Sequence, residues 1–203
     1  RFRELAALTA MTIVVLGISD RAEAQLDKMF SRVPTDANAI IAVDLDDLEA
    51  SELGQENKWA QQRAIRQAPG VYSPNVRSVL TSASVKPMQL ESKWELTLLE
   101  AKIAPNMDAL AVKLGSQVDR IDGTPIIETR GEAYVVLLAE KLIGVLHPAG
   151  RQDVANWLRS KKPTGQSDYL RAAVKRITDR TPIVAAIDLR DVTTEANVRV
   201  ALE

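Results

Sequence analysis

Residues 118–147 read VDRIDGTPIIETRGEAYVVLLAEKLIGVLH, and they contain the clearest strand pattern in the chain. It contains short runs rich in Val, Ile and Leu, which are typical of strands. The runs cover residues 118–121, 125–129, 133–138 and 142–147. Asp122-Gly123, between the first two runs, is a dipeptide favoured in two-residue hairpin turns. The stretch therefore predicts an antiparallel meander of four strands.

Helices with recognisable ends flank this meander. Asn106 is a favoured cap for a helix over 107–114, and Gly115 follows the last turn, where glycine is preferred. After the meander, an apolar stripe predicts a helix over 151–160, and Ser167 caps another. The meander is thus bordered by helices on both sides in the sequence.

The rest of the chain adds further strands and helices. Ser73-Pro74 predicts a helix start, because serine is a favoured cap and proline suits the first helical turn. The remaining predicted elements are strands over 40–45, 94–102 and 183–189 and helices over 47–53 and 55–67. Strands and helices do not alternate regularly. We therefore expect an α+β fold with an antiparallel-rich sheet and helices packed on one face.

The first 24 residues differ in character from the rest of the chain. Arg1 and Arg3 precede an uncharged run over 5–18, and Ala22-Glu23-Ala24 has the small-x-small pattern of a cleavage site. That run is shorter than the roughly 20 residues that a membrane-spanning helix needs. We expect a secretory signal peptide, and hence an exported protein in the periplasm, at the cell surface or outside the cell. An uncleaved anchoring helix is the alternative.

Composition excludes several kinds of chemistry. The chain has no Cys and one His, so it lacks disulfides, thiol catalysis and Cys-based or multi-His zinc sites. Its formal net charge is −1, which leaves no basic excess for nucleic-acid binding. No glycine-rich phosphate loop occurs, since Gly115, Gly123 and Gly131 each fit a turn. An aromatic content of 4% predicts an aliphatic core.

The strand near the N-terminus has a weak counterpart 144 residues later. Residues 40–48 align with 184–192, with identities at Ala42, Asp44, Leu45 and Asp47. The similarity favours a repeated module, and the alternative is that strand–helix junctions in general prefer Asp and Leu. The expected organisation is a signal peptide over 1–24, an α+β domain over 25–180 and the truncated start of a second repeat over 181–203.

Several short patterns carry a resemblance to a known group of proteins. They are Val33-Pro34-x-Asp36-Ala37-x-Ala39, a strand ending in Asp44-Leu45, the Trp94-Glu95 strand, and Gly131-x-x-Tyr134-Val135-Val136 before a helix. Together they resemble uncharacterised exported domains common in planctomycete-type bacteria. The resemblance spans residues 31–192 and implies export and an α+β fold with repeated halves. It implies no catalytic residue and no activity.

Four acidic residues, Asp44, Asp46, Asp47 and Glu49, are the densest candidate for a metal site. Their oxygens suit Ca²⁺, which takes about 6–8 such ligands. The calcium-loop pattern Asp-x-Asp-x-Asp-Gly is absent, however, and acids at a helix start also cap it and offset its dipole. We expect Asp46 to cap a helix with Glu49 three residues later, and we assign no metal site.

Other candidate groups have structural explanations too. His147, the lone histidine, ends a predicted strand, and no Gly-x-Ser-x-Gly nucleophile motif accompanies it. Trp59, Trp94 and Trp157 are expected in core packing or helix–sheet contacts, although sugar sites commonly use aromatic platforms. Basic residues give the C-terminal third a positive face, which is either solvated helix surface or a contact for an anionic envelope surface or acidic partner. They are Arg151, Arg159, Lys161, Lys162, Arg171, Lys175, Arg176 and Arg180.

The sequence thus predicts an exported, non-catalytic domain that binds a protein or envelope partner or has a structural role in the cell envelope. No residue is assigned a catalytic, cofactor-binding or metal-binding role, and no cofactor is expected. One alternative is a hydrolase with dispersed carboxylates. The other is an envelope protein anchored by an uncleaved N-terminal helix, which is the only segment expected to contact a membrane.

Overall fold

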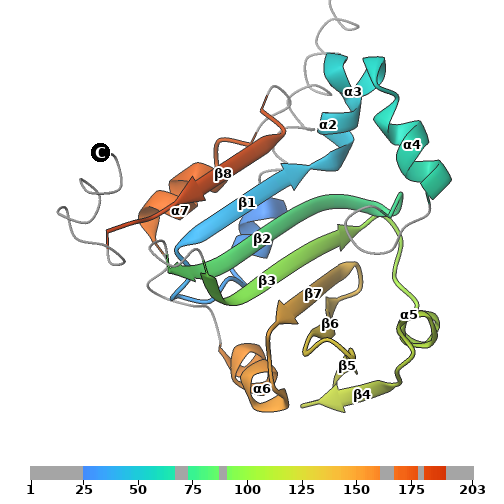
Figure 1. Ribbon diagram of the computed structural model, residues 1–203, viewed down its shortest axis with the longest axis vertical. Coiled ribbons are helices and arrows are strands. Elements are labelled where there is room, and N and C mark those ends of the chain that lie inside the picture. The colour runs from blue at the N-terminus through green and yellow to red at the C-terminus, as the bar shows by residue number, and fades with distance from the viewer. Residues whose placement is uncertain (1–24, 67–72, 87–90, 161–166, 178–180, 191–203) are drawn as a thin grey trace, which may run out of the picture.

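The computed structural model describes residues 25–66, 73–86, 91–160, 167–177 and 181–190. These residues form one eight-stranded sheet in the order β4-β5-β6-β7-β3-β2-β1-β8, and all neighbouring strands are antiparallel (Figure 1). The α+β class with an antiparallel sheet is therefore confirmed. The strands are β1 (Ala39–Asp44), β2 (Val76–Lys86), β3 (Glu91–Ala101), β4 (Val118–Ile121), β5 (Thr124–Glu128), β6 (Tyr134–Ala139), β7 (Leu142–His147) and β8 (Ile183–Ile187).

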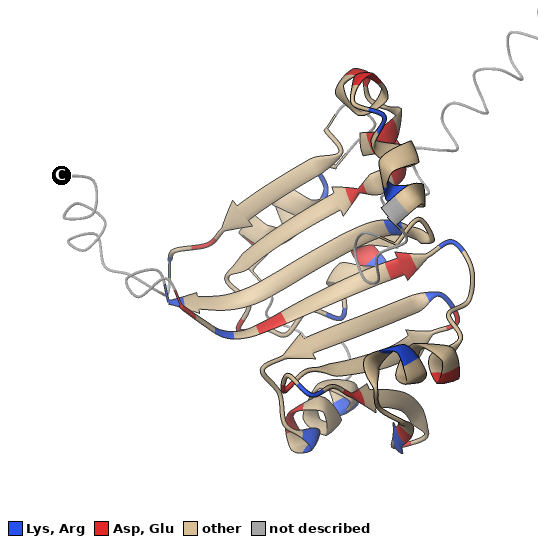
Figure 2. Ribbon diagram, turned by 45° about the vertical axis from the view of Figure 1, so that its right-hand side comes forward, with Lys and Arg blue, Asp and Glu red and all other residues tan. Residues whose placement is uncertain are grey.

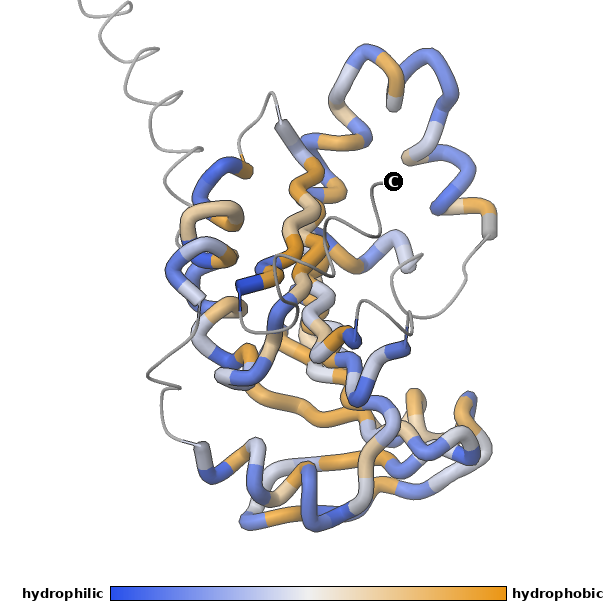
Figure 3. The backbone as a smooth tube through the Cα atoms, turned by 60° about the vertical axis from the view of Figure 1, so that its left-hand side comes forward, coloured by the Kyte–Doolittle hydropathy of each residue, from blue (hydrophilic) through white to orange (hydrophobic). Residues whose placement is uncertain are grey.

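The first face of the sheet, defined by Ile40, Leu80, Leu98 and Val136, carries the main core. It packs against the helical residues 25–30 and against α6 (Arg151–Arg159) and α7 (Asp168–Val174). Figure 3 shows hydrophobic residues concentrated along the strands, whereas the helices mix hydrophobic and hydrophilic residues. The core is aliphatic apart from a few aromatic side chains, as the composition predicts.

Helices also pack on the second face of the sheet. There α5 (Met107–Leu114) places Met107 and Ala111 against Ile127 and Val135. Helices therefore pack on both faces of the sheet, whereas the sequence predicts them on one face only. The physical reason is that β5 and β6 are buried on both sides, and consecutive apolar residues such as Ile126 and Ile127 do not show which face a helix covers.

The meander and the flanking helices follow the local sequence signals. The β4–β5 hairpin turns at Asp122 and Gly123, which have φ of 48° and 81°, as a two-residue turn of this kind requires. Helix α5 begins after Asn106, whose side chain accepts a hydrogen bond from the Ala109 N–H. It ends at Gly115, which has φ of 66°. These predictions are confirmed.

Two local predictions near the N-terminus are wrong. The segment after Ser73-Pro74 is β2 and not a helix, because it lies between β1 and β3 and is buried on both faces. The helix after β1 is capped by Asp44 and not by Asp46. It divides into α2 and α3, and together with α4 it lies beyond the end of β1 (Figure 1). The three helices are α2 (Leu45–Ala50), α3 (Glu52–Glu56) and α4 (Trp59–Arg66).

Several expectations concern residues outside the described part of the chain. The signal peptide over 1–24 lies there, and so do residues 191–203 of the expected second repeat. The first strand of that repeat is β8, which belongs to the same sheet as β1. Among the described residues, no helix combines the length and the apolar character that crossing a bilayer requires.

Candidate binding cleft

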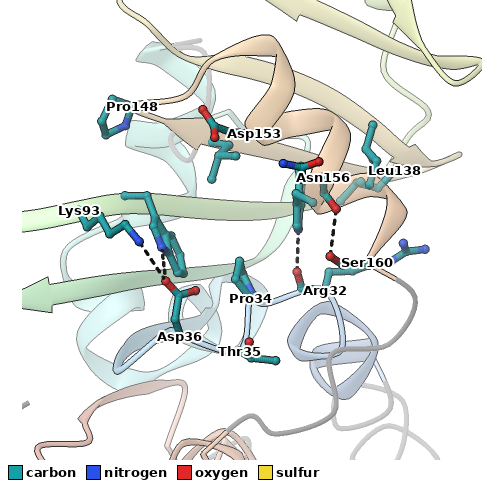
Figure 4. Close-up of a pocket in the computed structure, with 14 residues that line it drawn as sticks. Arg32, Pro34, Thr35, Asp36, Lys93, Leu138, Pro148, Asp153, Asn156 and Ser160 are labelled. Atoms are coloured by element: carbon teal, nitrogen blue, oxygen red, sulfur yellow. Dashed lines mark hydrogen bonds and ion pairs between the residues drawn. The ribbon is translucent and has the colours of Figure 1, made fainter. Parts of the chain in front are cut away.

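A cleft of about 700 Å³ opens on the first face of the sheet, between the loop after residues 25–30 and helix α6 (Figure 4). Its walls come from segments far apart in the sequence: the loop, the start of β3, the ends of β6 and β7, and α6. The side chains that matter most for its chemistry are Asp36, Lys93, Trp94, Asp153, Asn156 and Trp157.

One wall of the cleft is organised around Asp36. Its Oδ2 accepts a hydrogen bond from Trp94 Nε1 at 3.1 Å, and Lys93 Nζ lies 3.8 Å from the same oxygen. The Asp36 and Lys93 side chains are 52% and 69% exposed, so solvent screens this ion pair strongly. The indole of Trp94 is half-buried, so part of the ring stays accessible.

The opposite wall is organised around Trp157. Its Nε1 donates a hydrogen bond to the Arg32 carbonyl at 2.9 Å, which ties α6 to the loop. The ring lies over Gly144 of β7, where an added Cβ would approach Trp157 Cη2 to 2.5 Å. Trp157 therefore makes the helix–sheet contact expected of it. Trp59 lies on α4 and does not line the cleft.

The polar groups of α6 that face the cleft have structural partners. Asp153 Oδ2 accepts the Gly150 N–H at 2.8 Å and so caps the helix. Asn156 Oδ1 accepts a hydrogen bond from Gln152 at 3.0 Å, and the Asn156 carbonyl accepts the Ser160 hydroxyl at 2.9 Å. One edge of α6 thus presents fixed polar atoms at the rim of the cleft.

The cleft contains two carboxylates, and both are held by protein donors. Asp36 is bonded to an indole and paired with a lysine, and Asp153 caps a helix. His147 lies elsewhere: Leu146 faces the cleft, so alternation along β7 turns His147 to the second face, opposite Glu95. This arrangement offers apolar ring surface and paired polar groups to a ligand.

The acidic cluster over 44–49 is spread over separate structural roles. Asp44 Oδ1 accepts the N–H groups of Asp46 and Asp47 at 3.0 and 3.1 Å. Asp46 pairs with Lys102 at 2.6 Å and with Arg77 at 3.3 Å. Glu49 pairs separately with Arg63 at 2.7 Å. Within the described part of the chain, no three His, Cys, Asp or Glu side chains are grouped to hold a metal ion.

Glu100 on β3 is a buried acidic residue that no sequence pattern indicates. It is 9% exposed on the first face, and no group in the described part of the chain bonds its Oε2. Burial raises the pKa of its carboxyl; Asp44 adds to the rise, while Arg77 and Lys28 oppose it. The residue follows Leu98 and Leu99, and no local pattern distinguishes it from a surface glutamate.

Among the described residues, two of the basic side chains of the C-terminal third are paired with acids and so do not contribute to an open positive face. Arg151 pairs with Asp119, and Arg159 pairs with Asp122 at 2.8 Å, so two of them lie against the β4–β5 hairpin. The Arg171 guanidinium lies 5.5 Å from the centre of the Phe30 ring. Figure 2 shows blue and red side by side around α6. Lys161, Lys162 and Arg180 lie outside the described residues.

Comparison with known proteins supplies no relative. No family model matches the chain, and no curated protein and no solved structure matches it at a significant level.

Proposed function

We propose that the protein is an exported cell-envelope domain that acts by binding, and that the cleft beside α6 is where its ligand binds. The observation that carries the proposal is the presence of Trp94 and Trp157 in one open cleft with polar side chains at its rim. Export itself rests on the pattern of residues 1–24, and the short patterns over 31–192 support kinship with exported planctomycete-type domains.

The chemistry of the cleft favours a neutral, hydroxyl-rich chain such as a glycan. Indole rings offer apolar surface to the C–H faces of sugars, and their N–H groups are already engaged by Asp36 and the Arg32 carbonyl. Acidic and basic side chains are both present at the rim, which disfavours ligands of strong single charge. Lys93 and Asn156 are exposed and suited to hydrogen-bond hydroxyl groups.

The two carboxylates of the cleft fit a binding function better than a hydrolytic one. Glycoside hydrolysis needs one carboxyl group that delivers a proton and a second that attacks or activates water. Asp153 is committed to the cap of α6, and Asp36 bonds the Trp94 indole. The alternative function is a hydrolase with dispersed carboxylates. If the cleft hydrolyses a glycan, the protein releases reducing ends from it, and Asp36→Asn abolishes this release.

Tryptophan fluorescence tests the binding proposal directly. The full chain is titrated with short oligomers of N-acetylglucosamine as a neutral glycan probe, in parallel with calorimetry. We expect saturable binding that Lys93→Ala and Asn156→Ala weaken at least about tenfold, or about 1.4 kcal/mol. Trp59→Phe, which changes a tryptophan outside the cleft, leaves the binding constant unchanged. Saturable binding that both rim variants leave intact contradicts the proposed site.

Mass spectrometry of the protein recovered from its natural source tests export. A mature N-terminus at Gln25 supports cleavage after Ala24. A retained segment over 1–24 in the membrane fraction supports the anchored alternative, in which the same cleft faces the envelope.

A further inference from the structure

Within the part of the chain that the structure describes, the outer edge of β8 has unpaired backbone groups. Among the described residues, β1 is the only strand that pairs with β8. At the two ends of this pair, Asp44 N–H donates to Pro182 O and Asp188 N–H donates to Asn38 O. Because hydrogen bonding alternates along antiparallel strands, the even-numbered residues of β8 bond β1. The N–H and C=O groups of Ile183, Ala185 and Ile187 therefore point away from the sheet.

The opposite edge of the sheet is protected from such pairing. Strand β4 is four residues long and carries Asp119 and Arg120. On its outer side, the Arg120 carbonyl accepts a hydrogen bond from Arg151 at 2.9 Å, and the Arg120 N–H bonds the Asp119 side chain at 2.6 Å. Charged side chains that occupy edge groups in this way are a common defence against strand addition.

Strand β8 has none of these defences within its five residues, IVAAI. Figure 2 shows β8 and β1 without charged residues until the end of each strand. On the second face, Ile183 and Ile187 are 48% and 53% exposed, and Ile41 of the neighbouring β1 is 51% exposed. These three residues form an aliphatic patch that adjoins the open edge.

Strands β1 and β8 are similar in sequence and pair symmetrically with each other. A shift of 144 residues aligns them, and their register places Ile41 opposite Ala185, which are equivalent under that shift. The pair is thus related by a local two-fold axis normal to the sheet. Strand β1 is paired on both sides, with β8 and with β2, whereas no described strand pairs with the outer side of β8.

We propose that the outer edge of β8 pairs with the β8 edge of a second copy of the chain, across a two-fold axis at Ala185. In this register Ile183 lies opposite Ile187 of the second copy, and every outward N–H and C=O of the strand is bonded. β-Branched side chains directly opposite each other stabilise antiparallel pairs. A two-fold contact of this kind is self-complementary and closed, so it gives a dimer and not a fibre.

The proposal is independent of the proposed glycan site. The cleft lies on the first face near β3 and α6, whereas the aliphatic patch lies on the second face at β8. Loss of dimerisation would therefore leave the cleft unchanged, and loss of glycan binding would leave the dimer unchanged.

Analytical ultracentrifugation over a concentration series tests the proposal, up to about 500 μM because a small interface binds weakly. We expect a monomer–dimer equilibrium in the full chain. Ala185→Pro removes an outward N–H and spares the ladder to β1, so the dissociation constant should rise at least about tenfold with the circular dichroism spectrum retained. Ile187→Lys should act similarly. Val112→Lys changes an equally apolar residue, 78% exposed on α5, and should have no effect.

A cysteine introduced at the axis gives a second readout, since the chain has no cysteine of its own. Paired strands bring opposite Cα atoms within about 5.5 Å, a separation that a disulfide can bridge. Mild oxidation of Ala185→Cys should give a covalent dimer, and Val112→Cys should not. A chain that stays monomeric at every concentration and after oxidation overturns the proposal. The partner of this edge would then be a strand of another module. A dimer that persists in Ala185→Pro also overturns it.

Discussion

Asp44 and Asp188 make matching backbone hydrogen bonds at the two ends of the β1–β8 pair. Asp44 N–H donates to Pro182 O at 2.9 Å, and Asp188 N–H donates to Asn38 O at 2.7 Å. Their side chains match as well, because each Oδ1 accepts the backbone N–H two residues later, at 3.0 and 3.2 Å. Each carboxylate also accepts a serine hydroxyl, from Ser78 and Ser167 respectively. The two aspartates thus end their strands in the same way.

Removal of the Asp44 side chain is expected to destabilise the start of α2. Asp44→Ala deletes the acceptor for two helix N–H groups and for the Ser78 hydroxyl, so the free energy of unfolding should fall by about 1–2 kcal/mol. Asp44→Asn keeps a capping oxygen and should stay within about 0.5 kcal/mol of the parent. Urea unfolding followed by circular dichroism measures both. Equal losses in the two variants would show that the charge, and not the cap, is what matters.

Local signals account for the parts of the fold that the sequence predicts well. Asp122-Gly123, Asn106 and Gly115 each specify a turn or a helix end through their own backbone preferences. The prediction failed for β2, because Val76 and Val79 have helical spacing while the segment is buried between two strands. Burial on both faces removes the alternation that identifies a strand.

The cleft could not be predicted in the same way. The Trp94–Asp36 hydrogen bond joins residues 58 apart, and the Trp157–Arg32 bond joins residues 125 apart. Periodicity and caps describe a few neighbouring turns and carry no information on such pairings. The sequence indicates the tryptophans as candidates, whereas their partners in the cleft are defined only by the fold.

Asp188 is expected to stabilise the fold at neutral pH and to lose this contribution in acid. Hydrogen bonds from Arg190 and Ser167 hold the pKa of its carboxyl far below the usual range. A depressed folded-state pKa contributes stability that is complete above the unfolded value of about 3.9 and is lost as the pH falls toward the folded value. Asp188→Asn should therefore cost about 1 kcal/mol at pH 7 and progressively less below pH 4.

Urea unfolding of both proteins between pH 7 and pH 2 checks this expectation. Ser167→Ala, which removes one of the two donors, should reduce the pH dependence in part. It should also weaken the start of α7, because the Ser167 hydroxyl accepts the Leu170 N–H at 3.3 Å. A constant stability difference between the parent and Asp188→Asn over the whole range would contradict the assignment.

Glu100 is expected to have the opposite pH dependence. Burial raises the pKa of its carboxyl, so the folded protein binds a proton more tightly than the unfolded chain does. The free energy of unfolding is then greatest below the pKa that the Glu100 carboxyl has in the unfolded chain. It falls as the pH rises through the pKa of this carboxyl in the folded protein. Glu100→Gln removes the charge and should raise the free energy of unfolding at pH 7 by about 1 kcal/mol, with no gain near pH 4. Glu95→Gln, an exposed site on the same strand, should change it by less than about 0.5 kcal/mol.

Gly144 is expected to be required for the seating of Trp157 on the sheet. A Cβ at this position would lie 2.5 Å from Trp157 Cη2 and 3.1 Å from Leu138 Cδ1, so Gly144→Ala should lower the free energy of unfolding by about 1–3 kcal/mol. Trp157→Leu removes the clashing atom, and the double variant should be less destabilised than the two single effects together predict. Gly131→Ala is the matched control, since nothing lies within 4 Å of its added Cβ, and it should be neutral or slightly stabilising. Strict additivity in the double-mutant cycle, measured by urea unfolding, would mean that the indole does not rest on Gly144.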